Sequence, residues 1–168
     1  MLKKHRAKVK TKDSDKSLKW QQAWDHEYQK QGIPSSFRNT PARVVTEFYS
    51  WLEKRNFKGS QAADLGCGRG RNSLYLASNG FSVTALDLLK ENADCVAHQA
   101  NLMRLPIVAH AQNVSNPWPI ATNSLDIAID IFCYKHVTNK QSQKLYREEL
   151  ARTLKSTGYY FVSLASEN

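Results

Sequence analysis

The chain has 168 residues, of which 41% are hydrophobic, and this suits one domain with a sizeable core. No apolar run approaches the roughly 20 residues needed to cross a bilayer, and no apolar segment of a secretory signal follows the lysine-rich start. The three cysteines (Cys67, Cys95 and Cys133) have neither paired CxxC nor Cys/His metal-ligand spacing. We therefore expect reduced thiols, no bound metal, no membrane association and a cytoplasmic protein.

The formal net charge of +9 is concentrated at the N-terminus. Residues 1–19 hold eight of the 24 basic and two of the 15 acidic residues, so they account for +6 and the rest of the chain for +3. We expect residues 1–17 to be a disordered basic tail. Such a tail could also contact nucleic-acid phosphates, and that alternative stays open.

Three aromatic side chains at helical spacing predict the first ordered element, a helix over residues 18–30. They are Trp20, Trp24 and Tyr28. A loop rich in Pro, Ser and Gly follows, after which Thr40 as N-cap and Pro41 as first residue predict a second helix ending near Asn56. We expect residues 18–57 to form N-terminal helices that cover either a bound ligand or the sheet edge.

Strand and helix patterns alternate from residue 58 onward, and residues 58–168 are expected to form a single ligand-binding domain. Short apolar runs predict strands over residues 62–65, 81–86, 107–112 and 159–164, and isoleucines and a leucine that alternate with Asp, Ala and Asp predict another over residues 125–131. Helices are predicted over residues 71–78, 88–103 and 138–155, with Gly80 and Gly158 as C-terminal stops and a Thr138–Gln141 capping box. This alternation predicts an α/β fold, a doubly wound, Rossmann-like and mostly parallel sheet with right-handed crossovers.

A glycine-rich loop follows the first predicted strand, where ligands bind in such a sheet. Its sequence runs Asp64-Leu-Gly-Cys-Gly-Arg-Gly70. A phosphate-binding P-loop needs Lys and then Ser or Thr after its last glycine, but Arg71 and Asn72 stand there. A dinucleotide-binding loop needs a third glycine where Arg71 or Ser73 stands, depending on the frame. Both alternatives are therefore weakened.

The pattern Asp64-x-Gly66-x-Gly68-x-Gly70, with Asp87 directly after the second strand, resembles motif I of the class I S-adenosylmethionine-dependent methyltransferases. Further blocks extend the resemblance to roughly residues 62–164. It implies S-adenosyl-L-methionine as cofactor and S-adenosyl-L-homocysteine as product. More narrowly, residues 64–87 look like the same stretch of the tellurite-resistance type methyltransferases, which resemble thiopurine and other small-thiol methyltransferases.

This resemblance implies roles for individual residues. Asp64 would hold the cofactor's ammonium group, directly or through water, and Asp87 would accept both ribose hydroxyls, although Asp87 could instead cap the next helix. The glycines would let the methionine half lie against the loop. The full set expected at the cofactor is Asp64, Gly66, Cys67, Gly68, Gly70, Asn72, Asp87, Leu88, Asn113, Val114 and Ile131. The family's usual Asp beside adenine is absent after the third strand.

In-line methyl transfer from sulfur needs alignment more than acid–base help, but a weak nucleophile also needs a base. Asp130, Tyr134 and His136 are the catalytic candidates near the end of the fourth strand. Tyr134 could instead cover the cofactor, and His136 could pack against the following helix. If the N-terminal helix acts as a lid, its contacts with cofactor or substrate are expected from Tyr28, Phe37 and Arg38.

Two more strands usually follow the fifth strand in this family, whereas this sequence stops at Asn168. We therefore expect a fold truncated after the fifth strand, and a monomer or a weak homodimer through the exposed edge of that strand. The expected function is methyl transfer to a small-molecule acceptor. The alternatives are a cofactor-binding domain without activity in this form, and an RNA or protein methyltransferase. No Asn-Pro-aromatic quartet follows the fourth strand, which argues against nucleic acid as a partner.

Overall fold

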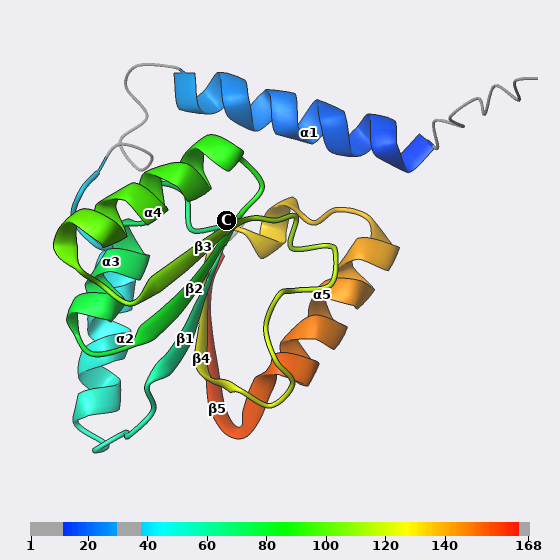
Figure 1. Ribbon diagram of the computed structural model, residues 1–168. Coiled ribbons are helices and arrows are strands. Elements are labelled where there is room, and N and C mark those ends of the chain that lie inside the picture. Colours follow the sequence, from blue (N-terminus) through cyan, green and yellow to red (C-terminus); the bar gives the residue numbers. More distant parts are fainter. Residues whose placement is uncertain (1–11, 30–37, 165–168) are drawn as a thin grey trace, which may run out of the picture. The chain divides into compact units, whose positions relative to one another are not determined.

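The computed structural model describes residues 12–29 and 38–164 (Figure 1). The chain divides into two compact units, Met1–Ile33 and Pro34–Asn168. The first unit contains the helix α1 (Lys12–Gln29), which begins inside the stretch predicted to be a disordered tail. On α1, the rings of Trp24 and Tyr28 lie 6.4 Å apart, so these two side chains share one face as predicted. The side chain of Trp20 lies outside the described residues.

The second unit is a parallel five-stranded sheet flanked by helices. Its strands are β1 (Gln61–Leu65), β2 (Ser82–Asp87), β3 (Ile107–Ala111), β4 (Leu125–Ile131) and β5 (Leu154–Ser163). Its helices are α2 (Arg43–Glu53), α3 (Arg71–Ser78), α4 (Lys90–Met103), the 3-10 turn η1 (Tyr134–His136) and α5 (Lys140–Thr153). The spatial order β3-β2-β1-β4-β5 reverses beside β1, which confirms the predicted Rossmann-like α/β sheet.

Both faces of the sheet are covered. Figure 1 shows α2, α3 and α4 on one face and α5 on the other. On the first face, Phe48 of α2 and Leu76 of α3 pack with Ile129 of β4 in one apolar cluster. On the second face, Tyr146 of α5 packs with Trp118 from the loop between β3 and β4. Burial on two faces explains why neighbouring residues of β1, Ala62 and Ala63, are both apolar, since each packs in the cluster on one face.

The loop over residues 113–123 contains no helix or strand, as predicted, and α5 holds it in place. The backbone N–H of Trp118 donates to Glu149 Oε2 at 2.6 Å. The Arg152 guanidinium donates to the carbonyl oxygens of Trp118 and Ile120 at 3.2 and 2.8 Å. Trp118 Nε1 donates to the Val114 carbonyl at 2.9 Å, which fixes the first residues after β3.

Two predicted helix caps are wrong. The residue preceding α2 is Ala42 and not Thr40, and no side chain caps this end. At α5 the cap is Asn139, whose Oδ1 accepts from the backbone N–H groups of Gln141 and Ser142, so the predicted capping box at Thr138 does not form. Asn and Thr are both good N-caps, and tertiary packing decides which of two adjacent residues takes the position.

Gly158 was also misinterpreted as the end of a helix, because it lies inside β5. The helix α5 ends at Thr153, and β5 starts at the next residue. The pairing with β4 is irregular there: Leu125 pairs with Leu154, but Ile127 pairs with Tyr159. A Cβ on Gly158 would lie 2.9 Å from the Leu154 side chain, so glycine is needed for this irregularity rather than for a helix end.

Candidate functional site

Three buried carboxylates lie toward the carboxyl ends of β1, β2 and β4. Asp64, Asp87 and Asp130 are 1%, 7% and 0% exposed, respectively. Their strands are neighbours, with Leu65 of β1 paired to Leu86 of β2 and to Asp130 of β4. Ligands bind at this edge of a doubly wound sheet, and clustered carboxylates favour a ligand with positive charge.

Asp87 joins the glycine loop to the start of α4. Its Oδ2 accepts from the Gly68 backbone N–H at 2.8 Å. Its Oδ1 accepts from the Leu89 N–H at 2.9 Å and from Asn92 Nδ2 at 3.0 Å. Burial raises the pKa of Asp87 although these hydrogen bonds oppose the shift. Asp87 thus bonds to the N–H of Leu89, the N-cap residue of α4, but no side chain caps this helix end, so Asp87 does not take the capping role that the sequence left open.

All three loop glycines have a backbone conformation that favours glycine, and two of them are also packed closely against the protein itself. Gly66, Gly68 and Gly70 have φ values of +74°, +54° and +85°, a region that side-chain-bearing residues rarely adopt. A Cβ on Gly66 would lie 2.7 Å from the Cys133 side chain, and one on Gly70 would lie 2.6 Å from Val96 Cγ2. From the sequence, we expected glycine here only because the ligand must lie against the loop. The structure shows that the turn after β4 and helix α4 also leave no room for a side chain.

Asp64 has one partner that the sequence analysis missed. Ser73 Oγ, on the first turn of α3, donates to Asp64 Oδ2 at 2.6 Å. Burial raises the pKa of Asp64 to about 7, the Ser73 hydrogen bond opposes this, and the charges of Asp130 and Asp87 add to it. Ser73 stands where a dinucleotide-binding loop would carry glycine. A side chain at this position was the one sign in the sequence that it could bond to Asp64.

Asp130 organises the turn that follows β4. Its carboxylate accepts from the backbone N–H groups of Cys133 at 2.7 Å and Tyr134 at 3.0 Å. Tyr146 on α5 donates its hydroxyl to Asp130 at 2.5 Å and lies 3.2 Å from the Tyr160 hydroxyl of β5. Burial raises the pKa of Asp130 against these hydrogen bonds. With its carboxylate buried and occupied, Asp130 positions this turn and presents no open face to an acceptor in this conformation.

The other two catalytic candidates belong to η1. The Tyr134 hydroxyl accepts from Arg147 at 2.8 Å, and its ring centroid lies 4.8 Å from that of Tyr146, so Tyr134 packs against α5. His136 is half-buried. Burial first, and then the charge of Lys135, lower the pKa of His136, so its imidazole is neutral near pH 7 and able to accept a proton.

The remaining predicted residues are spread around the same edge. Asn72 is buried, and its Oδ1 accepts from the Ala42 N–H at 2.9 Å, so it connects α3 to the start of α2. Asn113 Oδ1 accepts from the Ser115 N–H at 2.9 Å within the loop after β3. Cys67 and Val114 are buried, whereas Leu88 and Ile131 are half-buried.

The expected lid residues are only partly described. Tyr28 is half-buried on α1, Arg38 is exposed ahead of α2, and Phe37 lies outside the described residues. Within residues 12–29 and 38–164, no three His, Cys, Asp or Glu side chains are grouped to hold a metal ion. No helix in this part of the chain is long and apolar enough to cross a membrane.

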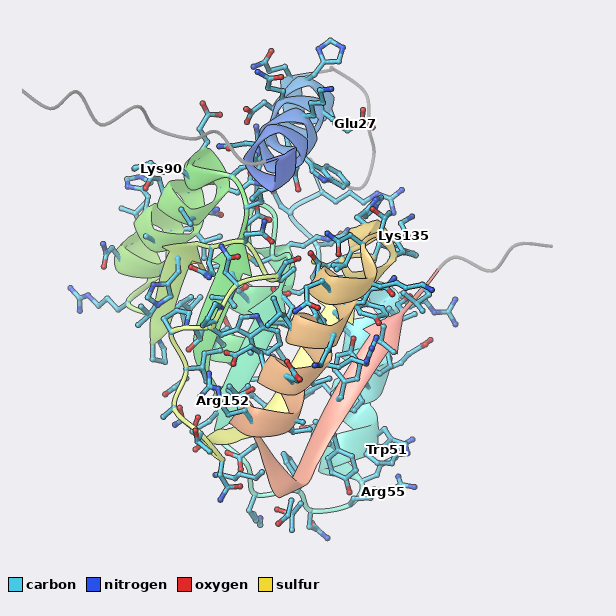
Figure 2. All side chains as sticks on the ribbon, turned by 90° about the vertical axis from the view of Figure 1, so that its right-hand side faces the viewer. Glu27, Trp51, Arg55, Lys90, Lys135 and Arg152 are labelled. Atoms are coloured by element: carbon cyan, nitrogen blue, oxygen red, sulfur yellow. The ribbon has the colours of Figure 1, made fainter. Side chains whose placement is uncertain are left out.

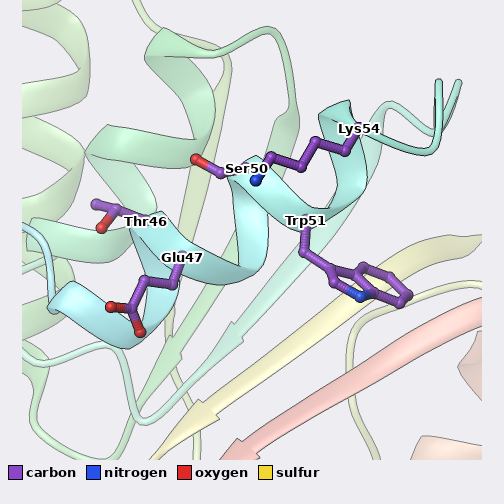
Figure 3. Close-up of a pocket in the computed structure, with 5 residues that line it drawn as sticks. All are labelled: Thr46, Glu47, Ser50, Trp51 and Lys54. Carbon is purple, nitrogen blue, oxygen red and sulfur yellow. The ribbon is translucent and has the colours of Figure 1, made fainter.

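A shallow hollow along α2 is a weaker candidate site. It is lined by Thr46, Glu47, Ser50, Trp51 and Lys54 (Figure 3). Figure 2 shows Trp51 and Arg55 at the opposite end of the second unit from Lys90 and Lys135, which follow β2 and β4. The Trp51 end of the hollow therefore lies at the opposite end of the unit from the residues that follow β2 and β4.

Comparison with known proteins identifies relatives of this domain. The curated tRNA/tmRNA (uracil-C(5))-methyltransferase of Cellvibrio japonicus is 27% identical over 113 residues, which are 67% of this chain and 30% of that protein. A solved Burkholderia thailandensis structure, 1,6-didemethyltoxoflavin-N1-methyltransferase with bound 1,6-didemethyltoxoflavin and S-adenosylhomocysteine, superposes with a TM-score of 0.73 at 19% identity. That match covers 98% of this chain and 68% of the other.

A S-adenosylmethionine-dependent methyltransferase from Aquifex aeolicus also has this fold, with a TM-score of 0.60 and 21% identity over 74% of this chain and 67% of the other. The chain thus spans less than a third of the curated relative and about two thirds of these structures. The family model described as Methyltransferase domain matches residues 63–162, from β1 to β5. Because this match covers more than half of the chain, the protein belongs to the Methyltransferase domain family.

Proposed function

We propose that the chain binds S-adenosylmethionine and transfers its methyl group to a small-molecule acceptor. The observation that carries the proposal is the loop Gly66–Gly70, held against the Asp87 carboxylate beside a second buried carboxylate, Asp64. A positively charged sulfonium and ammonium suit such carboxylates better than an anionic pyrophosphate does. Family membership supports the same conclusion.

The proposed assignments follow the geometry of the loop. Asp87 accepts the ribose hydroxyls, since each carboxylate oxygen has two lone pairs and its protein partners do not use all of them. Asp64 interacts with the cofactor's ammonium group, directly or through water. Leu88 and Val114 flank the adenine. Bound there, S-adenosylmethionine would supply the methyl group: the acceptor would bond to the methyl carbon as the sulfur–methyl bond breaks, and the sulfur would keep the electron pair.

His136 is the base in this proposal when the acceptor must lose a proton. It follows β4 at the ligand-binding edge, and its lowered pKa leaves it neutral at pH 7. Asp130 is a positioning residue, because its carboxylate is occupied by the turn and by Tyr146. Tyr28, Phe37 and Arg38 remain the proposed contacts of the N-terminal segment with cofactor or acceptor.

The acceptor class rests on two lines of support. Residues 64–87 look like the tellurite-resistance type enzymes, and the Burkholderia protein of the same fold is a 1,6-didemethyltoxoflavin-N1-methyltransferase. The second candidate, an RNA base, is favoured by one observation: the Cellvibrio relative acts on uracil in tRNA and tmRNA. We also place the protein in the cytoplasm, which is consistent with three free cysteines.

Calorimetry with S-adenosylmethionine, S-adenosylhomocysteine and NADH tests the cofactor. We expect micromolar binding of the first two, and tighter binding of NADH would overturn the proposal. Transfer of a radioactive methyl group from S-adenosylmethionine then distinguishes the acceptors. Labelling of small thiols and heteroaromatic compounds supports the proposal, whereas labelling confined to bulk tRNA favours the RNA candidate.

A further inference from the structure

An exposed and strained aromatic residue stands at the end of β4. Phe132 is the first residue after this strand and has a φ of +67°. Bulky residues rarely adopt this backbone region, because their Cβ approaches the following carbonyl. The Phe132 side chain is nevertheless 41% exposed, so burial of the ring does not compensate for this conformation. Such outliers collect where a ligand or a switch needs them.

The backbone around Phe132 is fixed from both sides. Its N–H donates to the Ser163 carbonyl of β5 at 3.0 Å. The next two N–H groups, of Cys133 and Tyr134, donate to the buried Asp130 carboxylate. The turn is therefore held rigidly and projects the ring from the end of the sheet.

The Phe132 turn borders the glycine loop. Cys133 approaches Gly66 so closely that a Cβ there would lie 2.7 Å from its side chain. Phe132 is thus one residue away from direct contact with the loop that would hold the methyl donor. Lys135 Nζ lies 4.9 Å from the centroid of the Phe132 ring, and this lysine is exposed. Figure 2 shows Lys135 at the same end of the unit as Lys90, which follows β2.

We propose that Phe132 and Lys135 form the acceptor platform of this domain, on which a planar aromatic or heteroaromatic acceptor stacks and pairs an anionic oxygen with the lysine ammonium. The inference rests on the proposed function and names its substrate class. Offset stacking on a rigid ring orients a planar molecule, and the flexible stem of lysine lets its ammonium move from the ring to an oxygen. Held in this way, the acceptor lies beside the glycine loop, where in-line transfer requires it.

The test measures binding of three small probes to protein saturated with S-adenosylhomocysteine, by saturation-transfer NMR titration. Naphthoate is aromatic and anionic, naphthamide is aromatic and neutral, and the saturated analogue decahydronaphthoate is anionic without a π-face. We expect naphthoate to bind most tightly. Phe132→Leu should weaken naphthoate binding by about fivefold, through loss of stacking. Lys135→Gln should abolish the preference for naphthoate over naphthamide.

Two controls separate this platform from general surface effects. Lys90→Gln removes an exposed lysine at the same end of the unit. Trp51→Leu removes an exposed aromatic ring whose centroid lies 3.8 Å from the Arg55 guanidinium carbon, so it also removes a cation–π pair. Both should bind naphthoate like the unmodified protein. Equal binding of all three probes, or unchanged binding in both platform variants, overturns the inference. Failure of the unmodified protein to bind S-adenosylhomocysteine overturns the proposed function instead.

Discussion

The backbone N–H of Gly68 donates a 2.8 Å hydrogen bond to the carboxylate of Asp87, and this contact joins the glycine loop to the end of β2. Leu89 and Asn92 hold the other oxygen of the same carboxylate. Asp87 is therefore oriented by the protein before any ligand arrives, and preorganisation of this kind lowers the cost of binding. The side chain that shapes the loop is therefore the one that we propose as the ribose contact.

Replacing Asp87 with alanine should weaken S-adenosylmethionine binding by about tenfold or more, equivalent to about 1.4 kcal/mol. The variant loses the proposed ribose contact and also frees the Gly68 N–H from its partner. Calorimetry measures the affinity, and circular dichroism checks the fold. Asp94→Ala is the matched control, because Asp94 is an exposed residue of α4 paired with Lys90. Unchanged affinity in Asp87→Ala would contradict the ribose assignment.

Asp64 should make the unliganded protein less stable as the pH rises. Its pKa is raised from 3.8 to about 7, chiefly by burial. Between these values the folded state holds a proton that the unfolded state has lost, so the free energy of unfolding falls with increasing pH, by up to about 1.4 kcal/mol per pH unit. Asp64→Asn cannot titrate, so its stability should fall less steeply. Urea denaturation at several pH values between about 4 and 7 measures both slopes.

Burial also raises the pKa values of Asp87 and Asp130, so Asp64→Asn should keep part of the slope. Ser73→Ala provides a second check. It removes the 2.6 Å hydrogen bond that favours ionised Asp64, so the pH at which the slope ends should move upward. Parallel curves for the unmodified protein and Asp64→Asn would show that Asp64 does not titrate in this range.

Tyr146→Phe should destabilise the protein more than Tyr160→Phe. The Tyr146 hydroxyl is buried and donates to Asp130 at 2.5 Å, so its removal leaves a buried carboxylate with one donor fewer, at a cost of about 2 kcal/mol. The Tyr160 hydroxyl lies 3.2 Å from the Tyr146 hydroxyl and, of the hydrogen bonds that lower the pKa of Asp130, makes the smallest contribution, so its loss should cost under about 1 kcal/mol. Equilibrium urea denaturation measures both, and equal costs would contradict the central role of the Tyr146–Asp130 bond.

The features predicted correctly from the sequence are those that local patterns encode. The β4 strand and the α3 helix have their predicted bounds, because an alternating apolar pattern marks the strand and glycines bound the helical segment. The glycine loop was recognised because its spacing depends on backbone conformation within a few residues. The place of Asp87 at the carboxyl end of β2 was predicted in the same way, although the strand includes this residue and was expected to end at Leu86.

The missed features depend on contacts between distant parts of the chain. Tyr146 meets Asp130 across 16 positions, and nothing in either local pattern indicates this pair. The same holds for Asn72, which bonds to Ala42 across 30 positions and so serves packing before any ligand. Gly158 was misplaced because a glycine after a helix usually ends it, whereas here the glycine accommodates an irregular strand pairing.

Alanine substitutions at Gly70 and Gly80 should distinguish the cost of backbone strain from the cost of close packing. Both have positive φ, +85° and +92°, but a Cβ on Gly70 would lie 2.6 Å from Val96 Cγ2, whereas one on Gly80 would meet nothing within 4 Å. Gly80→Ala should therefore cost only the strain, about 1 kcal/mol. Gly70→Ala should cost at least about 1 kcal/mol more and weaken binding of S-adenosylmethionine, because the loop must move away from α4.

In a Val96→Ala background, which removes the clashing methyl groups, Gly70→Ala should approach the cost of Gly80→Ala. Urea denaturation of the four variants measures this coupling, and its absence would show that the loop relaxes without disturbing α4.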